Sequence, residues 1–202
     1  MESGDVVTTE EFINLLHDAY ESTDEALRSK YQRSLSFQDG LFDRWDRAKR
    51  LGFGEGTSVY NSALVYGDVS VGRQTWIGPN AILDGSGGGL TIGDFCSISS
   101  GVHIYTHDTV LWALSGGQLA AHRAKVNIGN CVYVGSQSII AAGVSIGSRS
   151  VIGANSFVNK NVADATVVVG TPARRIGSVI GEGSDVRIVF DAKTRSEQEK
   201  SS

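Results

Sequence analysis

Histidines and nearby carboxylates are the side chains of this chain best suited to proton-transfer chemistry. His103, His107 and His122 fall close together in the sequence, whereas His17 stands alone near the N-terminus. An imidazole, with a reference pKa of about 6.5, removes a proton from a hydroxyl or amine near neutral pH. It works best when a carboxylate or carbonyl holds its second ring nitrogen, and Asp84 and Asp108 are the candidates for that role. The pattern allows general-base chemistry.

The two cysteines are weaker candidates for chemistry than the histidines. Cys96 and Cys131 both fall at positions of the repeat described below where a small buried side chain is expected, and neither belongs to a C-x-x-C pair. We expect reduced core thiols in both cases, and neither stands in the setting of a nucleophile.

Length and charge limit the classes of function. The chain has 202 residues, 41% of them hydrophobic, which is enough for one main domain with an appendage. A net charge of −4 without a basic run makes nucleic acid an unfavoured partner. The sequence shows no long apolar stretch and no leader pattern, so we expect a soluble, cytoplasmic protein that does not insert into membranes.

The elements that would position these side chains begin with a helical segment. Thr8 and Glu11 predict a capping box, and Phe12, Leu15, Leu16, Ala19 and Tyr20 recur at helical spacing. A second helical pattern runs through Leu41, Trp45 and Ala48. We expect residues 1–55 to form a helical cap that covers one end of the next domain or packs on a neighbouring subunit.

From Val59 the periodicity changes to six. Glycine often follows the aliphatic residue, and a small or β-branched residue often comes four places after it, as at Thr75 and Ser138. The repeating aliphatic residues are Val59, Val65, Val71, Ile77, Leu83, Ile92, Ile98, Ile104, Ile128, Val134, Ile140, Ile146, Ile152 and Val158. Three such hexads make one triangular coil with the aliphatic residue inside and the small residue at the corner.

The repeat is interrupted twice. A glycine-rich insertion, residues 84–89, adds three residues to the spacing, and a longer loop occupies residues 105–127. Insertions in a solenoid collect where function lies. After Val158 the pattern fades, and we expect residues 178–202 to form a C-terminal extension that is partly mobile.

A family resemblance follows from these motifs. The hexads, the loop opening Tyr105-Thr106-His107-Asp108, and the ending from Asn159-Lys160 through Gly170-Thr171-Pro172-Ala173-Arg174 resemble the hexapeptide-repeat acyltransferases over about residues 59–177. Within that superfamily the sequence looks most like the galactoside and maltose O-acetyltransferases and the acetyltransferases of nucleotide-linked or polysaccharide sugars. The resemblance implies a left-handed parallel β-helix, an all-β main domain over residues 56–177, with the helical segment before it.

The same resemblance implies roles on the acceptor side. It makes His107 the general base in a direct transfer from acetyl-CoA to a hydroxyl or amine of a sugar or nucleotide sugar. Asp84 becomes an acceptor ligand or an orienting group for His107, although an aspartate that opens a turn is an alternative. Asp108 is the second orienting candidate, Asn80 stands where the family supplies a further polar residue, and Trp112 is suited to cover a sugar or adenine face or to anchor a subunit contact.

On the donor side the resemblance implies binding of acetyl-CoA, without a metal. Ser136 and Ala154 match the family positions beside the pantetheine arm, and the Ser136 amide is the expected donor to the thioester oxygen. Asn159, Lys160, Arg174 and Arg175 match the region of the phosphorylated end. The family assembles as a homotrimer with its active sites at subunit interfaces.

Two other classes of function stay open at the sequence level. The zinc-dependent γ-type carbonic anhydrases share this fold, and His103, His107 and His122 are the conceivable ligands. Against this reading, His103 and His107 stand closer together than that family's histidine pair, and His122 lies in a long loop. The other alternative is a non-catalytic trimeric β-helix that acts as a binding module.

Overall fold

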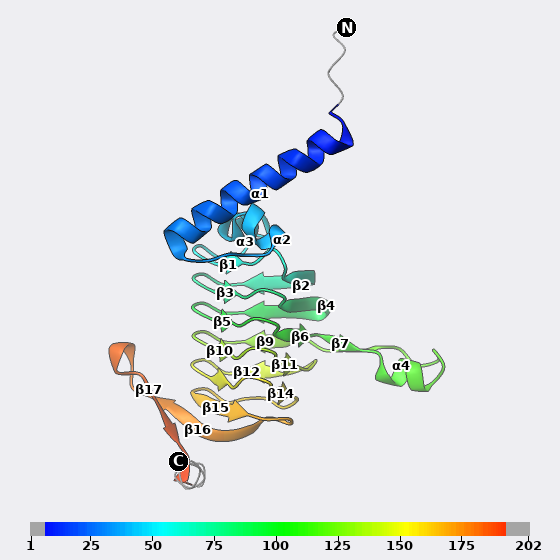
Figure 1. Ribbon diagram of the computed structural model, residues 1–202. Helices are drawn as coiled ribbons and strands as arrows, with labels where there is room; N and C mark the ends of the chain where they lie inside the picture. Colours follow the sequence, from blue (N-terminus) through cyan, green and yellow to red (C-terminus); the bar gives the residue numbers. More distant parts are fainter. Residues whose placement is uncertain (1–6, 193–202) are drawn as a thin grey trace.

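The computed structural model describes residues 7–192 and begins with three helices. These are α1 (Thr9–Tyr31), α2 (Phe37–Leu41) and α3 (Arg44–Arg50), as the helical pattern predicted. The predicted capping box is present, because the Glu11 amide donates to the Thr8 hydroxyl at 3.2 Å and the Thr8 amide donates to the Glu11 carboxylate at 2.8 Å. Figure 1 shows α2 and α3 over one end of the stack of strands, while α1 extends beyond it.

Below the helices the chain winds into a parallel β-helix. One side of each coil is a column of short strands in the order β1 (Ser58–Val59), β3 (Trp76–Ile77), β5 (Ser97–Ile98), β10 (Tyr133–Val134), β13 (Val151–Ile152) and β15 (Thr166–Val169). Within this column Val134 pairs with Ile98 of the coil before and Ile152 of the coil after, so equivalent hexad positions stack. This is the left-handed β-helix that the hexads predicted.

The other two sides share two long strands. The second side stacks β2 (Leu64–Val71), β4 (Ile82–Ile92), β6 (His103–Tyr105), β11 (Ile139–Ile140) and β14 (Phe157–Val158). The third side uses the later halves of β2 and β4, followed by β9 (Val126–Ile128) and β12 (Ser145–Ile146). The insertion at residues 84–89 therefore lies inside a continuous strand, β4, which runs across the corner between these two sides.

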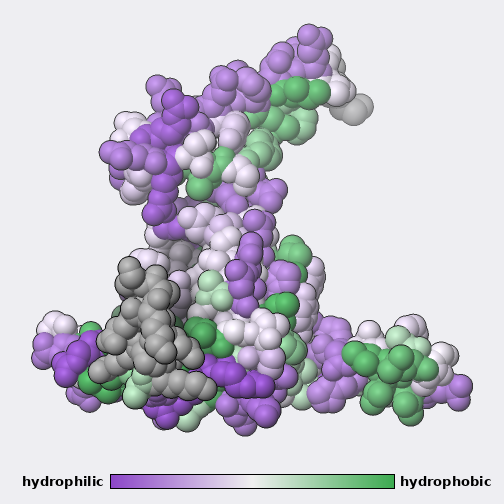
Figure 2. All heavy atoms as spheres, turned by 60° about the horizontal axis from the view of Figure 1, so that its bottom comes forward, coloured by the Kyte–Doolittle hydropathy of each residue, from purple (hydrophilic) through white to green (hydrophobic). Residues whose placement is uncertain are grey.

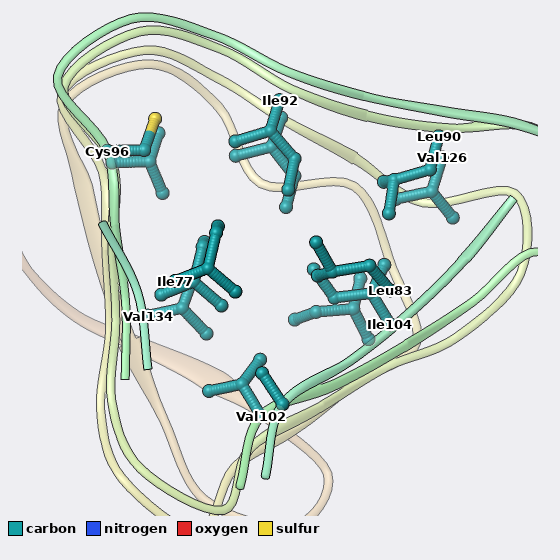
Figure 3. Close-up of a cluster of buried hydrophobic side chains, with 14 of the residues drawn as sticks. Ile77, Leu83, Leu90, Ile92, Cys96, Val102, Ile104, Val126 and Val134 are labelled. Carbon is teal, nitrogen blue, oxygen red and sulfur yellow. The ribbon is translucent and has the colours of Figure 1, made fainter. Parts of the chain in front are cut away.

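The core follows the six-residue pattern. All the predicted aliphatic positions are buried except Val65, which is partly buried against the core. Figure 3 shows Ile77, Leu83, Ile92 and Ile104 pointing into the triangle, with Cys96 and Val102 at its corners. Each buried aliphatic side chain removes enough apolar surface from water to contribute about 1.5–3 kcal/mol.

The prediction for one cysteine was wrong. Cys96 is buried at 2% exposure, but Cys131 is exposed, and Val132 takes the small buried position instead. Cys131 adopts a left-handed backbone conformation with φ of 57°. Its corner position, shared with Phe95 and Arg149 of neighbouring coils, turns the side chain outward.

Two segments leave the β-helix. The loop between β6 and β9 carries β7 (His107–Asp108), α4 (Val110–Leu114) and β8 (His122–Arg123), with β7 and β8 paired antiparallel. After the last coil, β16 (Arg174–Ile180), the short 3₁₀ helix η1 (Gly183–Asp185) and β17 (Arg187–Phe190) form an antiparallel hairpin beside β15. The end of the predicted mobile extension, residues 193–202, lies outside the described residues. Within residues 7–192, no helix is both long and apolar enough to cross a bilayer.

Candidate active site at the corner between β4 and β7

His107 lies where the long loop leaves the β-helix, beside the buried carboxyl group of Asp84. Nδ1 of His107 is 3.0 Å from Oδ2 of Asp84, whose side chain is only 5% exposed, against 35% for the histidine. The same nitrogen is 3.4 Å from Oγ of Ser86. The structure thus brings together His107 and Asp84, two of the residues that the sequence singled out.

Ser86 was not predicted as a site residue, although it lies inside the glycine-rich insertion that the sequence indicated. The second carboxylate oxygen of Asp84, Oδ1, accepts from the Ser86 amide at 2.9 Å and from the Ser86 hydroxyl at 2.6 Å. The turn-forming alternative for Asp84 is therefore present together with the contact to His107. These two hydrogen bonds fix the carboxylate plane and leave Oδ2 facing the imidazole.

Thr106 attaches the start of the loop to β4. Its hydroxyl donates to the Asp84 carbonyl at 2.8 Å and accepts from the Gly87 amide at 2.8 Å, and the residue is fully buried. A Cβ at Gly87 would lie 2.1 Å from the Thr106 carbonyl oxygen and 2.6 Å from Cβ of His107. Glycine at this position lets the two segments approach closely enough to place the imidazole beside Asp84.

Asp108 does not orient His107. Its Oδ2 lies 3.1 Å from Nδ1 of His122 on the facing strand of the loop, where both side chains are about half exposed. The Val110 amide and the His122 side chain lower the pKa of the Asp108 carboxyl group. Asp108 and His122 therefore form a second carboxylate–imidazole pair that holds the base of the loop together.

Two tyrosines flank Asp84 on the neighbouring coils. Tyr66 and Tyr105 occupy the same register as Asp84, one coil before and one coil after it. Burial raises the pKa of Tyr105, and the nearby Asp84 carboxylate and Tyr66 raise it further. The Tyr105 hydroxyl also lies 3.3 Å from Nδ1 of His103. Sequence reasoning assigned these tyrosines no role at the site, because hexad spacing does not distinguish side chains on the outer face.

Three predicted site residues lie at a different corner. Asn80 sits between β3 and β4 with φ of 56°, in the turn that precedes the second side of the coil. Ser136 and Ala154 occupy the same corner further down, one coil apart, where the Asn155 amide donates to the Ser136 carbonyl at 2.9 Å. In one chain, therefore, this corner and the His107 corner lie at opposite ends of the second side.

The basic residues gather at the far end of the β-helix. Asn159, Lys160, Arg174 and Arg175 line a hollow of about 400 Å³ together with apolar residues of the last coil such as Val158 and Val168. Arg175 is partly committed to the hairpin, since it donates to the Ser178 hydroxyl at 2.7 Å and lies 3.4 Å from the Asp191 carboxylate. Lys160 and Arg174 are both exposed at this end.

The remaining predicted positions lie in the loop or on β6, the strand just before it. Trp112 lies on α4, half exposed, within a projecting loop that forms an apolar patch at the side of Figure 2. His103, His107 and His122 each face a different partner, namely Tyr105, Asp84 and Asp108. Within residues 7–192, no three-residue cluster with metal-ligand spacing includes any of these histidines.

The comparisons with known proteins agree with the repeat. Residues 125–160 match the family described as bacterial transferase hexapeptide (six repeats). A chloramphenicol acetyltransferase from Morganella morganii is 35% identical over 108 residues, or 43% of this chain and 50% of that protein. A galactoside O-acetyltransferase from Escherichia coli K12 is 33% identical over 98 residues, or 45% of this chain and 48% of that protein. The chain thus spans about half the length of these two curated relatives.

A solved structure extends the likeness over more of the chain. A D94A mutant of AntD, an N-acyltransferase from Bacillus cereus in complex with dTDP and coenzyme A, has a TM-score of 0.57 and 23% identity. The match covers 77% of this chain and 94% of that one. At this identity the likeness establishes the fold.

Proposed function

We propose that this chain transfers an acyl group from acyl-CoA to a small acceptor. Its β-helix is of the hexapeptide-repeat kind and resembles that of the hexapeptide-repeat acyltransferases. The donor is acetyl-CoA, and the acceptor is a hydroxyl or amine of a sugar or nucleotide sugar. The observation that carries the proposal is the contact of 3.0 Å between His107 and the buried Asp84 at the corner where the long loop begins. The acetyltransferase relatives, and the N-acyltransferase of similar fold with its dTDP and coenzyme A, support the choice of substrates.

The geometry of this pair suits a general base. An ionised carboxylate accepts hydrogen bonds and does not donate them, so a contact with Oδ2 of Asp84 favours the tautomer with hydrogen on Nδ1 of His107. Nε2 then carries the lone pair that removes a proton from the acceptor. A carboxylate beside the ring also stabilises the imidazolium that forms.

The transfer itself needs no covalent acyl-enzyme. As Nε2 takes the acceptor proton, the acceptor oxygen or nitrogen bonds to the thioester carbonyl carbon and the carbonyl electron pair moves onto oxygen. The Ser136 amide is the proposed donor to that oxyanion. When the carbonyl re-forms, the carbon–sulfur bond breaks, and the departing thiolate takes the proton back from His107.

The basic hollow at the end of the β-helix is the proposed place for the phosphorylated end of the donor. Lys160 and Arg174 supply the charges, and Asn159 and Arg175 line the same hollow. Cations near phosphate oxygens form charge-assisted hydrogen bonds, which are stronger than neutral ones. Ala154 lies on the corner above, in line with a pantetheine arm that runs along the coils.

The site is proposed to form between copies in a homotrimer. His107 and Ser136 lie at opposite ends of one side of the coil. When three chains close around an axis, the His107 corner of one chain can therefore meet the Ser136 corner of the next chain. The loop carries exposed apolar side chains suited to such a contact, among them Leu111 at 54%, Trp112 at 50% and Leu114 at 80% exposure. The loop of one chain would then cover the acceptor bound beside its neighbour.

The direct test is acetyl-CoA-dependent thiol release with a panel of galactosides, nucleotide-linked amino sugars and polysaccharide fragments. We expect turnover with one acceptor class, reduced about 10²–10⁴-fold in His107→Ala, the range for loss of a general base. Turnover that His107→Ala leaves unchanged would remove the histidine from the mechanism. The proposal fails if no acceptor is acetylated and the protein does not bind coenzyme A. In that case, bound zinc together with hydration of carbon dioxide would indicate the carbonic anhydrase class. Binding of an acceptor without any turnover would indicate a binding module.

A further inference from the structure

The N-terminal half of α1 is an arm with exposed apolar side chains. None of the residues of α1, all of them described, is buried, and Phe12, Ile13 and Leu15 are exposed at 56%, 58% and 59%. The capping box at Thr8 and Glu11 marks a well-formed helix start, so the arm is helical up to its tip. Figure 2 shows this patch as a continuous green area on the projecting arm.

The C-terminal half of the same helix borders an apolar groove. Thr23, Leu27 and Tyr31 of α1 form one wall, and Leu35, Phe42, Trp45 and Tyr60 complete a hollow of about 290 Å³. Tyr31, Phe42 and Trp45 remain 53%, 54% and 46% exposed. The molecule therefore presents an unfilled apolar groove and an unpacked apolar helix face on the same element.

The arm cannot fill the groove of its own chain. Phe12 and Leu27 lie on one continuous helix, and fifteen residues at 1.5 Å per residue hold them about 22 Å apart. Only the arm of another molecule can bring Phe12 and Leu15 into the groove.

Charge favours a second copy of this chain as that molecule. The first turn of α1 carries Glu10 and Glu11, whereas Arg33 and Arg44 border the groove. The acids at the groove have other partners, since Asp39 accepts from Ser62 and Asp43 caps α3. An interfacial membrane helix is usually rich in lysine and arginine, whereas the polar face of α1 is mainly acidic.

We infer that the N-terminal half of α1 from one protomer docks its Phe12 and Leu15 side chains into the α1–α2–α3 groove of a neighbouring protomer, with its acidic tip beside Arg33 and Arg44. The contact is heterologous, because arm and groove are different surfaces. It can close into a ring such as the proposed trimer, and it involves none of the residues assigned to acyl transfer.

Cross-linking between copies tests this contact. Two chains with different affinity tags are made in a Cys131→Ser background, one with Phe12→Cys and the other with Tyr31→Cys. The two chains are co-expressed and then oxidised. We expect a disulfide-linked pair that contains both tags. The matched control is Asn14→Cys, on the same half of α1 but about 200° around the helix from Phe12, which we expect to cross-link at least tenfold less.

A second measurement needs no cysteine. Phe12→Asp with Leu15→Asp places charges on side chains that are already exposed, so the fold of the single chain should tolerate them. If the arm docks, the double variant shifts to smaller assemblies in light scattering, and Asn14→Asp does not. An unchanged assembly together with no mixed-tag cross-link would overturn the inference, as would a wild-type protein that is monomeric.

Discussion

At the scale of single residues, Asp84 and Asp108 show how surroundings separate two similar side chains. Both carboxylates lie about 3 Å from an imidazole nitrogen, but the Asp84 side chain is 5% exposed and that of Asp108 is 46% exposed. Water screens the exposed pair, whereas the buried carboxylate acts at lower dielectric. Only the first pair includes the proposed catalytic base.

We predict that Asp84→Asn lowers kcat about 10–10³-fold while thermal stability changes little, because the amide is isosteric but no longer stabilises the imidazolium. Asp108→Asn is the matched comparison, with the smaller effect expected. Equal losses in the two variants would contradict the assignment of Asp84 as the orienting residue.

The two cysteines allow a second prediction at this scale. Burial raises the pKa of the Cys96 thiol, whereas Cys131 is exposed. A thiolate-specific reagent at pH 8 should therefore modify Cys131 in the native protein and modify Cys96 only after unfolding. Labelling of native Cys131→Ser at the wild-type rate would show that the assignment is wrong.

The same pKa shift has a consequence at alkaline pH. A thiol whose pKa is higher in the folded than in the unfolded state, where it is about 8.5, holds its proton more tightly when folded. Its contribution to stability is complete below that value and declines as pH rises toward the folded pKa. Between pH 8 and pH 10, the melting temperature of Cys96→Ala should therefore fall by less than the melting temperature of the wild type.

Residue positions were predictable from sequence where the repeat imposed them. Thr75, Cys96 and Ser138 are buried at corners as expected, because three hexads per coil leave little room for large side chains there. The prediction placed Cys131 at the buried corner position that Val132, the next residue, occupies, since both side chains are small enough for a corner. The partner of His107 required the structure, because Asp84 and Asp108 are both plausible in sequence and only the path of β4 distinguishes them.

At the scale of elements, the glycine-rich part of β4 positions the loop. The sequence indicated that residues 84–89 interrupt the repeat, but periodicity does not show that they extend a strand rather than form a turn. In the structure they pair with Tyr66 and Gly67 of β2 on one side and with Tyr105 of β6 on the other. The hairpin of β16 and β17 was missed for a related reason, since it contains no hexads.

Gly87→Ala tests this positioning. The added methyl group would meet the Thr106 carbonyl oxygen at 2.1 Å, so the segment that carries His107 must move. We expect a loss of about 1–3 kcal/mol in stability, as for an overpacked site, together with a fall in kcat at least tenfold. Gly116→Ala is the control, because φ of 63° strains any side chain there but no atom lies within 4 Å of the new Cβ. If both variants keep full activity, the close approach at Gly87 does not set the position of His107.

At the scale of the whole molecule, the β-helix separates the two halves of the proposed site. Gly101 belongs to the corner of Asn80 and Gln137, and six extended residues, roughly 20 Å of chain, lead from it to His107. A rigid coil cannot fold one corner onto the other. The proposed base and the proposed oxyanion donor of a single chain therefore lie too far apart to act on the same acyl group, and we propose that they belong to different sites.

Mixing two inactive variants tests that conclusion. His107→Ala removes the base, and Ala154→Trp fills the donor corner with a side chain that an exposed position tolerates. If each site takes its base from one chain and its donor corner from the next, co-assembly at equal amounts restores up to about a quarter of the sites, one half for each required chain. The measurement is acetyl-CoA-dependent thiol release after the variants are unfolded and refolded together, with separately refolded variants mixed afterwards as the control. If the co-refolded sample is no more active than that control, base and donor corner belong to one chain.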